Sequence, residues 1–203
     1  MSPKRFAKHT GGFGVAELQK EWNEFLALLS RHRVRFVMVG GLAVSAHGRE
    51  RYTKDLEVLI DTSEANAKRV GRALVEFGFA RHGRAWRAFT KPYRILTLGR
   101  EPIRIDLLTS ITGVSFAKVW KGREIVSMAA GEIPVIGLAE LCENKRACGR
   151  PQDLADLAAL DEVERVRKAT RAAARNRSKR PRPAAPRSRT RGTVARPKRR
   201  PKS

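Results

Sequence analysis

The segment DLEVLI, residues 55–60, places two acids inside an otherwise apolar stretch that has the length of a β-strand. Residues two apart in a strand point to the same face, so Asp55 and Glu57 are expected side by side, about 7 Å apart at their α-carbons. Two carboxylates held this close repel each other unless they are protonated, paired with a cation or bound to a metal. Any fold of this chain must therefore supply positive charge beside this strand.

A third acid, Asp106, interrupts a second apolar segment, IRIDLLT at residues 103–109. An acid buried there costs several kcal/mol unless it is compensated. Arg104 and the basic residues of RYTKD offer one compensation, a set of ordinary salt bridges. Three acids on neighbouring strands favour a second kind of compensation, the binding of a hard cation. Oxygen ligands without nearby His or Cys favour Mg²⁺ or Mn²⁺, which usually complete their shell with substrate phosphates.

Gly40 and Gly41 end the predicted strand VRFVMVG, residues 34–40, just before a short predicted helix. Glycine lets a backbone approach a ligand closely, and a helix start offers N–H groups to an anion. A plain tight turn is the alternative interpretation of a Gly-Gly pair. Next to the acid-bearing strand, the pair favours a triphosphate cradle beside a metal site.

Hydrophobic periodicity and glycine or proline punctuation predict the remaining elements. Helices are expected at residues 15–32, 42–48, 63–77, 138–148 and from 151 onward, and strands at 34–40, 55–60, 80–90, 93–99 and 102–109, with short edge strands at 123–129 and 132–137. Helices before, between and after the strands indicate an α/β (α+β) fold, a mixed sheet flanked by helices.

The charge of the chain is unevenly distributed. The net charge is +23, and 17 of the 43 Lys and Arg residues lie between Arg165 and Ser203, where there is no acid. We expect a flexible N-terminus at 1–13, one domain at 14–167 and a disordered Arg-, Lys- and Pro-rich tail at 168–203. The tail has two interpretations: an arm that binds RNA such as tRNA, with an affinity that falls as salt rises, or a solubilising extension without a dedicated partner.

Several classes of protein are excluded. Cys142 and Cys148 are six residues apart on one predicted helix and face different sides, which argues against a disulfide or a thiol metal site. No apolar run approaches the roughly 20 residues that cross a bilayer, and no apolar signal core follows the basic N-terminus. We expect a cytoplasmic protein without membrane association.

These motifs resemble a known family. Gly-Gly, thirteen residues, Asp-hydrophobic-Glu-hydrophobic and a later strand acid are similar to the nucleotidyltransferase superfamily related to DNA polymerase β. More narrowly, GGLAVSAHGRERYTKDLEVLI together with IPVIGLAELCENKRACGRPQDLADLAAL resembles the minimal bacterial nucleotidyltransferases of the abortive-infection AbiE toxin type and their uncharacterised relatives. The resemblance spans roughly residues 36–160.

The resemblance implies a role for each matching residue. Metal binding and catalysis are implied for Asp55, Glu57 and Asp106, and nucleotide binding for Gly40, Gly41, Arg51, Thr53 and Lys145. An Arg-x-x-Asp-x-x-Asp pattern is matched by Arg150, Asp153 and Asp156. Two positions depart from the family: Glu57 stands where many relatives have Asp, and Gln152 replaces a frequent Lys. For Lys145, a solvated residue on an exposed helix face is the competing interpretation.

The implied activity is metal-dependent transfer of a nucleoside monophosphate from an NTP to an RNA or protein acceptor, with pyrophosphate released. A tRNA-like acceptor, a toxin role and an antitoxin protein partner are implied with it. The alternative from another class is a catalytically weak module with the same fold that binds nucleotide or nucleic acid. A third reading, a compactor of nucleic acid, would assign the whole function to the basic tail.

Overall fold

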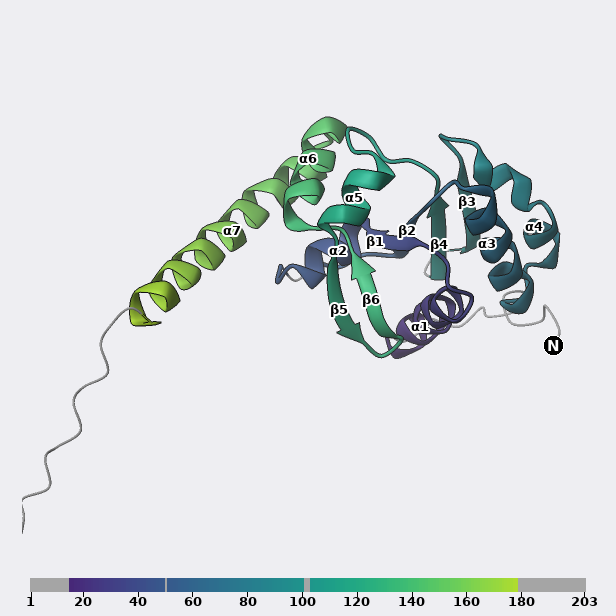
Figure 1. Cartoon of the computed structure of the whole chain (residues 1–203), viewed down its shortest axis with the longest axis horizontal. Coiled ribbons are helices and arrows are strands. Elements are labelled where there is room, and N and C mark those ends of the chain that lie inside the picture. The colour runs from purple at the N-terminus through teal and green to yellow at the C-terminus, as the bar shows by residue number, and fades with distance from the viewer. Residues whose placement is uncertain (1–14, 50, 101–102, 179–203) are drawn as a thin grey trace, which may run out of the picture. The chain divides into compact units, whose positions relative to one another are not determined.

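The computed structural model describes residues 15–49, 51–100 and 103–178. The chain divides into two units, residues 1–167 and 168–203, and the sheet and all candidate site residues belong to the first. The predicted α/β class is confirmed, because a six-stranded mixed sheet is flanked by helices (Figure 1).

The described elements mix helices and strands along the chain. They are α1 (Val15–Arg31), β1 (Phe36–Val39), α2 (Gly40–Ala46), β2 (Asp55–Ile60), α3 (Glu64–Glu76), α4 (Ala80–Arg84), the 3₁₀ helix η2 (Trp86–Thr90), β3 (Ile95–Arg100), β4 (Ile103–Leu108), α5 (Phe116–Gly122), β5 (Glu124–Met128), β6 (Gly131–Val135), α6 (Leu138–Cys148) and α7 (Pro151–Ser178).

The strands lie in the order β3-β4-β2-β1-β6-β5. β2 pairs antiparallel with β1 and parallel with β4, while β1 pairs parallel with β6. The outer strands β3 and β5 are antiparallel to their neighbours. The acid-bearing strands β2 and β4 are therefore direct neighbours at the centre of the sheet, next to the strand that leads into the glycine pair.

The core explains why these strands are central. All four side chains of β1 are buried, as are Val58, Leu59 and Ile60 of β2. The apolar stripe of α1 contributes Phe25 to this core, and α1 also packs against α3. A strand that is apolar on both faces over part of its length suits a position covered by helices on both sides.

The predicted strand at residues 80–90 is wrong. This segment forms α4 and η2, and α4 packs against α3. Gly83 and Gly71 allow this approach, since a β-carbon on Gly83 would lie 2.4 Å from the carbonyl oxygen of Gly71. Phe79, Gly83, Trp86 and Phe89 recur every three or four residues and turn toward the core. That spacing is helical rather than the alternation of a strand.

Two further expectations differ from the structure. β5 is an edge strand as predicted, but β6 lies inside the sheet between β1 and β5. Met38 of β1 pairs with Val135 of β6, and this buried contact draws β6 inward. Helix α7 continues to Ser178, so residues 168–178, expected in the disordered tail, are helical. The rest of the predicted tail and residues 1–13 lie outside the described part of the chain.

In the stretches that the structure describes, no helix combines the length and the apolar character needed to cross a membrane.

The stability of the domain depends on the buried strand β2. Ile60 is fully buried and pairs with Phe36 of β1, so Ile60→Ala is expected to lower the free energy of unfolding by about 2–5 kcal/mol. The control Ile125→Ala removes the same atoms from edge strand β5, where the side chain is 54% exposed. That change should cost less than about 1 kcal/mol. Urea denaturation followed by circular dichroism measures both, and equal losses would contradict this packing.

Candidate functional site

A glycine elbow joins β1 to α2. Gly40 is the first residue of α2 and has a φ of +67°, a left-handed conformation that favours glycine. A β-carbon on Gly40 would lie 1.6 Å from Oε2 of Glu57, so any side chain at this position would collide with the carboxylate. The elbow and the acid on the neighbouring strand thus touch, and the glycine is what permits the contact.

The three predicted acids are neighbours on adjacent strands. In the register of the sheet, Glu57 stands between Val39 of β1 and Asp106 of β4. Asp55 lies two residues earlier on β2 and therefore faces the same side as Glu57. The sequence placed these carboxylates together, and the strand register agrees with that placement.

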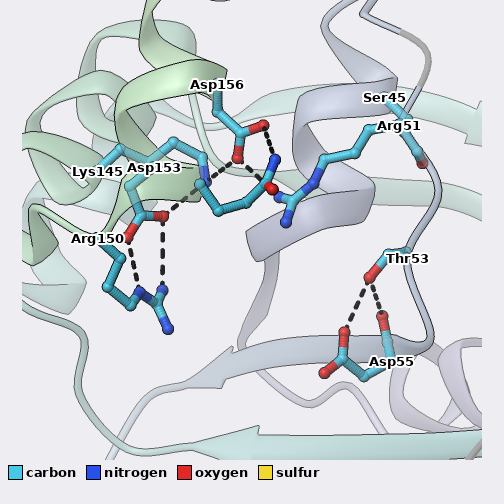
Figure 2. Close-up of polar contacts among 9 residues, drawn as sticks. Ser45, Arg51, Thr53, Asp55, Lys145, Arg150, Asp153 and Asp156 are labelled. Atoms are coloured by element: carbon cyan, nitrogen blue, oxygen red, sulfur yellow. Dashed lines mark hydrogen bonds and ion pairs between the residues drawn. The ribbon is translucent and has the colours of Figure 1, made fainter.

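Threonine hydroxyls hold two of the acids in place. Thr53 donates to Oδ1 of Asp55 over 2.8 Å (Figure 2). Thr97, which pairs with Asp106 in the β3–β4 register, donates to Oδ1 of Asp106 over 2.7 Å. Sequence reasoning named Thr53 but missed Thr97, whose only signal is a polar residue within the edge strand ILTLGR.

Arg104 compensates part of the negative charge. Its Nη2 pairs with Oδ2 of Asp55, and its Nε lies 3.1 Å from Oδ2 of Asp106. The parallel register sets Asp55 opposite Arg104, and Asp106 follows two residues later on the same face of β4. One guanidinium therefore bridges two of the three acids, as the salt-bridge interpretation of the sequence foresaw.

Glu57 carries the least compensated charge of the three. Its pKa is raised above the usual value, first by burial and then by the charges of Asp55 and Asp106. A hydrogen bond from the Gly41 backbone N–H and the charge of Arg150 act in the opposite direction. The elbow therefore already presents an N–H to a carboxylate oxygen, which is the interaction that a phosphate oxygen would make there.

A second charged cluster lies at the junction of α6 and α7. Gly149 ends α6 in the left-handed conformation and Pro151 begins α7, so the last turn of α6 faces the first turns of α7. Lys145 is buried, and its Nζ lies 3.1 Å from Oδ1 of Asp153 and 2.6 Å from Oδ2 of Asp156 (Figure 2). Lys145 is thus an ion-paired internal residue rather than a solvated one.

Two arginines extend this cluster toward the elbow. Arg51 donates from Nη1 to Oδ2 of Asp156 over 2.8 Å, and Arg150 donates from Nε to Oδ2 of Asp153 over 2.7 Å. Burial works to raise the pKa of Asp153, but the hydrogen bonds from Arg150 and Lys145 outweigh it and hold this pKa below its usual value. The five side chains comprise three cations and two acids, so the cluster keeps a net positive charge.

The two clusters line one pocket of about 610 Å³. Nine of the predicted site residues contribute to its wall: Gly40, Gly41, Arg51, Thr53, Asp55, Glu57, Lys145, Arg150 and Asp153. Asp106 and Asp156 are buried behind this surface and do not line it.

Several residues of the wall were not among the predicted site residues. Arg104, Ile95 and Leu108 come from β3 and β4, and Asn144 and Cys148 come from α6. The apolar members read as ordinary core residues in the sequence, so only the tertiary structure reveals that they border the pocket.

The chemistry of the acid cluster fits a divalent cation, because three oxygen-donor carboxylates against the single guanidinium of Arg104 leave negative charge in excess. The side chains do not form a ready cage. Within the described ranges, no group of three or more His, Cys, Asp or Glu residues is arranged to hold a metal ion. Arg104 bridges two of the carboxylates that a cation would use.

Solved structures include chains that are similar to this one. The chain is similar to the crystal structure of a candidate nucleotidyltransferase from Thermotoga maritima, with a TM-score of 0.45 and 17% sequence identity. The similarity covers 81% of this chain and 99% of the other. No protein-family model and no curated protein sequence matches the chain.

The raised pKa of Glu57 predicts a dependence of stability on pH. The folded state holds the proton more tightly than the unfolded state, so ionisation of Glu57 reduces stability as the pH rises from the usual glutamate pKa through the raised value. Glu57→Gln keeps the neutral form at every pH. We expect this variant to gain stability relative to the wild type between pH 4 and pH 7 in metal-free buffer.

Urea denaturation at both pH values measures this gain. The control is Glu132→Gln, which changes an exposed glutamate on β6 and should show no such trend. A difference between Glu57→Gln and the wild type that is constant with pH would contradict the raised pKa of Glu57.

The ion pairs of Lys145 predict a large structural effect. Lys145→Ala leaves Asp153 and Asp156 buried without their shared cation, so it is expected to lower the free energy of unfolding by about 3–5 kcal/mol. Arg150→Ala is the matched control, because its side chain is 72% exposed and its pair with Asp153 should contribute less than about 1 kcal/mol. Denaturant titration at pH 7 compares them, and equal losses would mean that Lys145 is not the internal counter-ion of these acids.

Proposed function

We propose that this chain is a metal-dependent nucleotidyltransferase that transfers a nucleoside monophosphate from an NTP to an RNA or protein acceptor and releases pyrophosphate. One observation carries the proposal: the glycine elbow touches a carboxylate of a three-acid cluster at the wall of a pocket large enough for a nucleotide. A phosphate-binding backbone and a cation-binding acid group are needed at the same place in this chemistry.

Hydrogen-bond donors and cations at one end of the pocket support the binding of a triphosphate there. The backbone N–H of Gly41 donates to the Glu57 carboxylate, so it is oriented toward an anion. Arg51 lies beside Gly41, since its Nη1 would be 3.3 Å from a β-carbon on Gly41. A hydrogen bond to Asp156 holds it there. Arg150 adds a second cation at the pocket wall. These groups suit a triphosphate, which carries several negative charges.

The metal would be held by Asp55, Glu57 and Asp106. When bound, Mg²⁺ or Mn²⁺ supplies positive charge for the reacting phosphate and lowers the pKa of the acceptor hydroxyl. The chain contributes orientation: Thr53 fixes Asp55, Thr97 fixes Asp106, and the elbow fixes Glu57. Catalysis would then depend mainly on positioning and electrostatics.

The proposed acceptor and the proposed biological role are supported by the sequence rather than by the pocket. The 17 basic residues between Arg165 and Ser203 suit a polyanion such as a tRNA-like RNA. The toxin role and an antitoxin partner rest on the resemblance of the two sequence blocks to AbiE-type enzymes. A neighbouring gene for a small DNA-binding protein would support that pairing.

A second candidate function is a catalytically weak module that binds nucleotide or nucleic acid. Arg104 favours it, because a guanidinium that bridges Asp55 and Asp106 could permanently replace the metal. The two candidates differ in a single measurable property, which is whether label moves from an NTP to an acceptor.

The test is transfer of label from α-³²P-labelled NTPs to bulk RNA or to protein in the presence of Mg²⁺ or Mn²⁺. Asp55→Asn removes one carboxylate charge and is expected to lower the rate at least about 100-fold. Asp161→Asn changes an exposed acid on α7 and should leave the rate unchanged. Circular dichroism checks that both variants fold.

Absence of transfer in the wild type with every NTP, together with unchanged nucleotide binding in Asp55→Asn, would support the binding module instead.

A further inference from the structure

We infer that Arg104 is an internal counter-ion of the acid cluster, and that a divalent cation binds only in exchange for its guanidinium. This inference rests on the proposed function, because it takes Asp55, Glu57 and Asp106 as the ligands of the ion. It goes further by assigning a role to a residue outside the motifs of the resemblance.

The contacts of Arg104 engage oxygens that a cation would need. Its Nη2 pairs with Oδ2 of Asp55, and its Nε lies 3.1 Å from Oδ2 of Asp106. The other oxygen of each acid, Oδ1, accepts a hydrogen bond from Thr53 or from Thr97. Both oxygens of each carboxylate therefore already have a partner, and an ion that bound either Oδ2 would lie directly beside the guanidinium.

Simultaneous occupancy is electrostatically unfavourable. A guanidinium and a divalent cation that share the same two oxygens would lie within a few ångströms of each other, where like charges repel strongly. The strand register fixes Arg104 opposite Asp55, so the two cannot separate through a shift of the backbone. Exchange must occur by rotation of the arginine side chain.

The surroundings of Arg104 permit this rotation. Its side chain is 35% exposed and lines the pocket of about 610 Å³. Lys145, the counter-ion of the second cluster, differs in this respect, since its side chain is only 4% exposed. A partly exposed arginine can leave its acids and become hydrated more readily than a buried lysine can.

The inference predicts opposite effects of Arg104→Gln on stability and on metal binding. Without metal, the variant should unfold at a lower temperature, because Asp55 and Asp106 lose their shared cation. With metal, it should bind Mn²⁺ about 10-fold more tightly, within the range of typical coupling between two mutually exclusive ligands. The rise in unfolding temperature on adding Mn²⁺ should therefore be larger in the variant than in the wild type.

Isothermal titration calorimetry with Mn²⁺ alone measures the affinity, and thermal denaturation with EDTA or with Mn²⁺ measures the stability. Arg104→Lys keeps one positive charge but loses the two-pronged geometry, so it should bind Mn²⁺ with intermediate affinity. It also provides a readout should Arg104→Gln fail to fold. Arg100→Gln, at an exposed arginine on β3, is the matched control and should change neither property.

The outcomes separate this inference from the proposed function. Equal Mn²⁺ affinities in the wild type, Arg104→Gln and Arg104→Lys would overturn the exchange while the metal site stands. Binding that is weaker in both variants would also overturn it, because Arg104 would then support the metal rather than compete with it. Absence of Mn²⁺ binding in all of these proteins would overturn both the inference and the metal site that the proposed function requires.

Discussion

The parallel pairing of β2 with β4 forces like charges together, and the rest of the site follows from how the fold compensates them. The register aligns Glu57 with Asp106, and Asp55 shares their face. Glu57 and Asp106 are largely buried, so water screens this repulsion less than it would at the protein surface. The glycine elbow, the threonine hydroxyls and Arg104 are the local responses to that one constraint.

The fold compensates its two charged clusters in different ways. At the α6–α7 junction, one buried lysine serves two buried acids, and removing either partner would leave the other charge uncompensated in a poorly hydrated place. Beside β2, one half-exposed arginine serves two acids and Glu57 remains in excess. The first cluster is almost fully ion-paired, whereas the second retains an excess of negative charge.

The sequence predicted most of this arrangement, and the misses have physical causes. The apolar residues around Asp55, Glu57 and Asp106 identified three strand acids because charge inside an apolar run is a strong local signal. The segment at 80–90 was misjudged because two small residues, Gly71 and Gly83, decide its helical packing at long range. A solvated position for Lys145 stayed open as an alternative because its partners Asp153 and Asp156 lie across a turn that ends one helix and begins the next.

The two sides of the pocket carry opposite charge, which would orient the substrate of the proposed reaction. An acid-rich side attracts a divalent cation, and a cation-rich side built by Arg51 and Arg150 attracts phosphate. Arg150 lowers the pKa of Glu57, so the two sides already interact electrostatically in the protein alone. A metal–triphosphate complex carries both charges in one ligand and can satisfy both sides at once. Neither a bare metal nor a bare phosphate carries both charges, so a pocket with two clusters of opposite sign is what the proposed function expects.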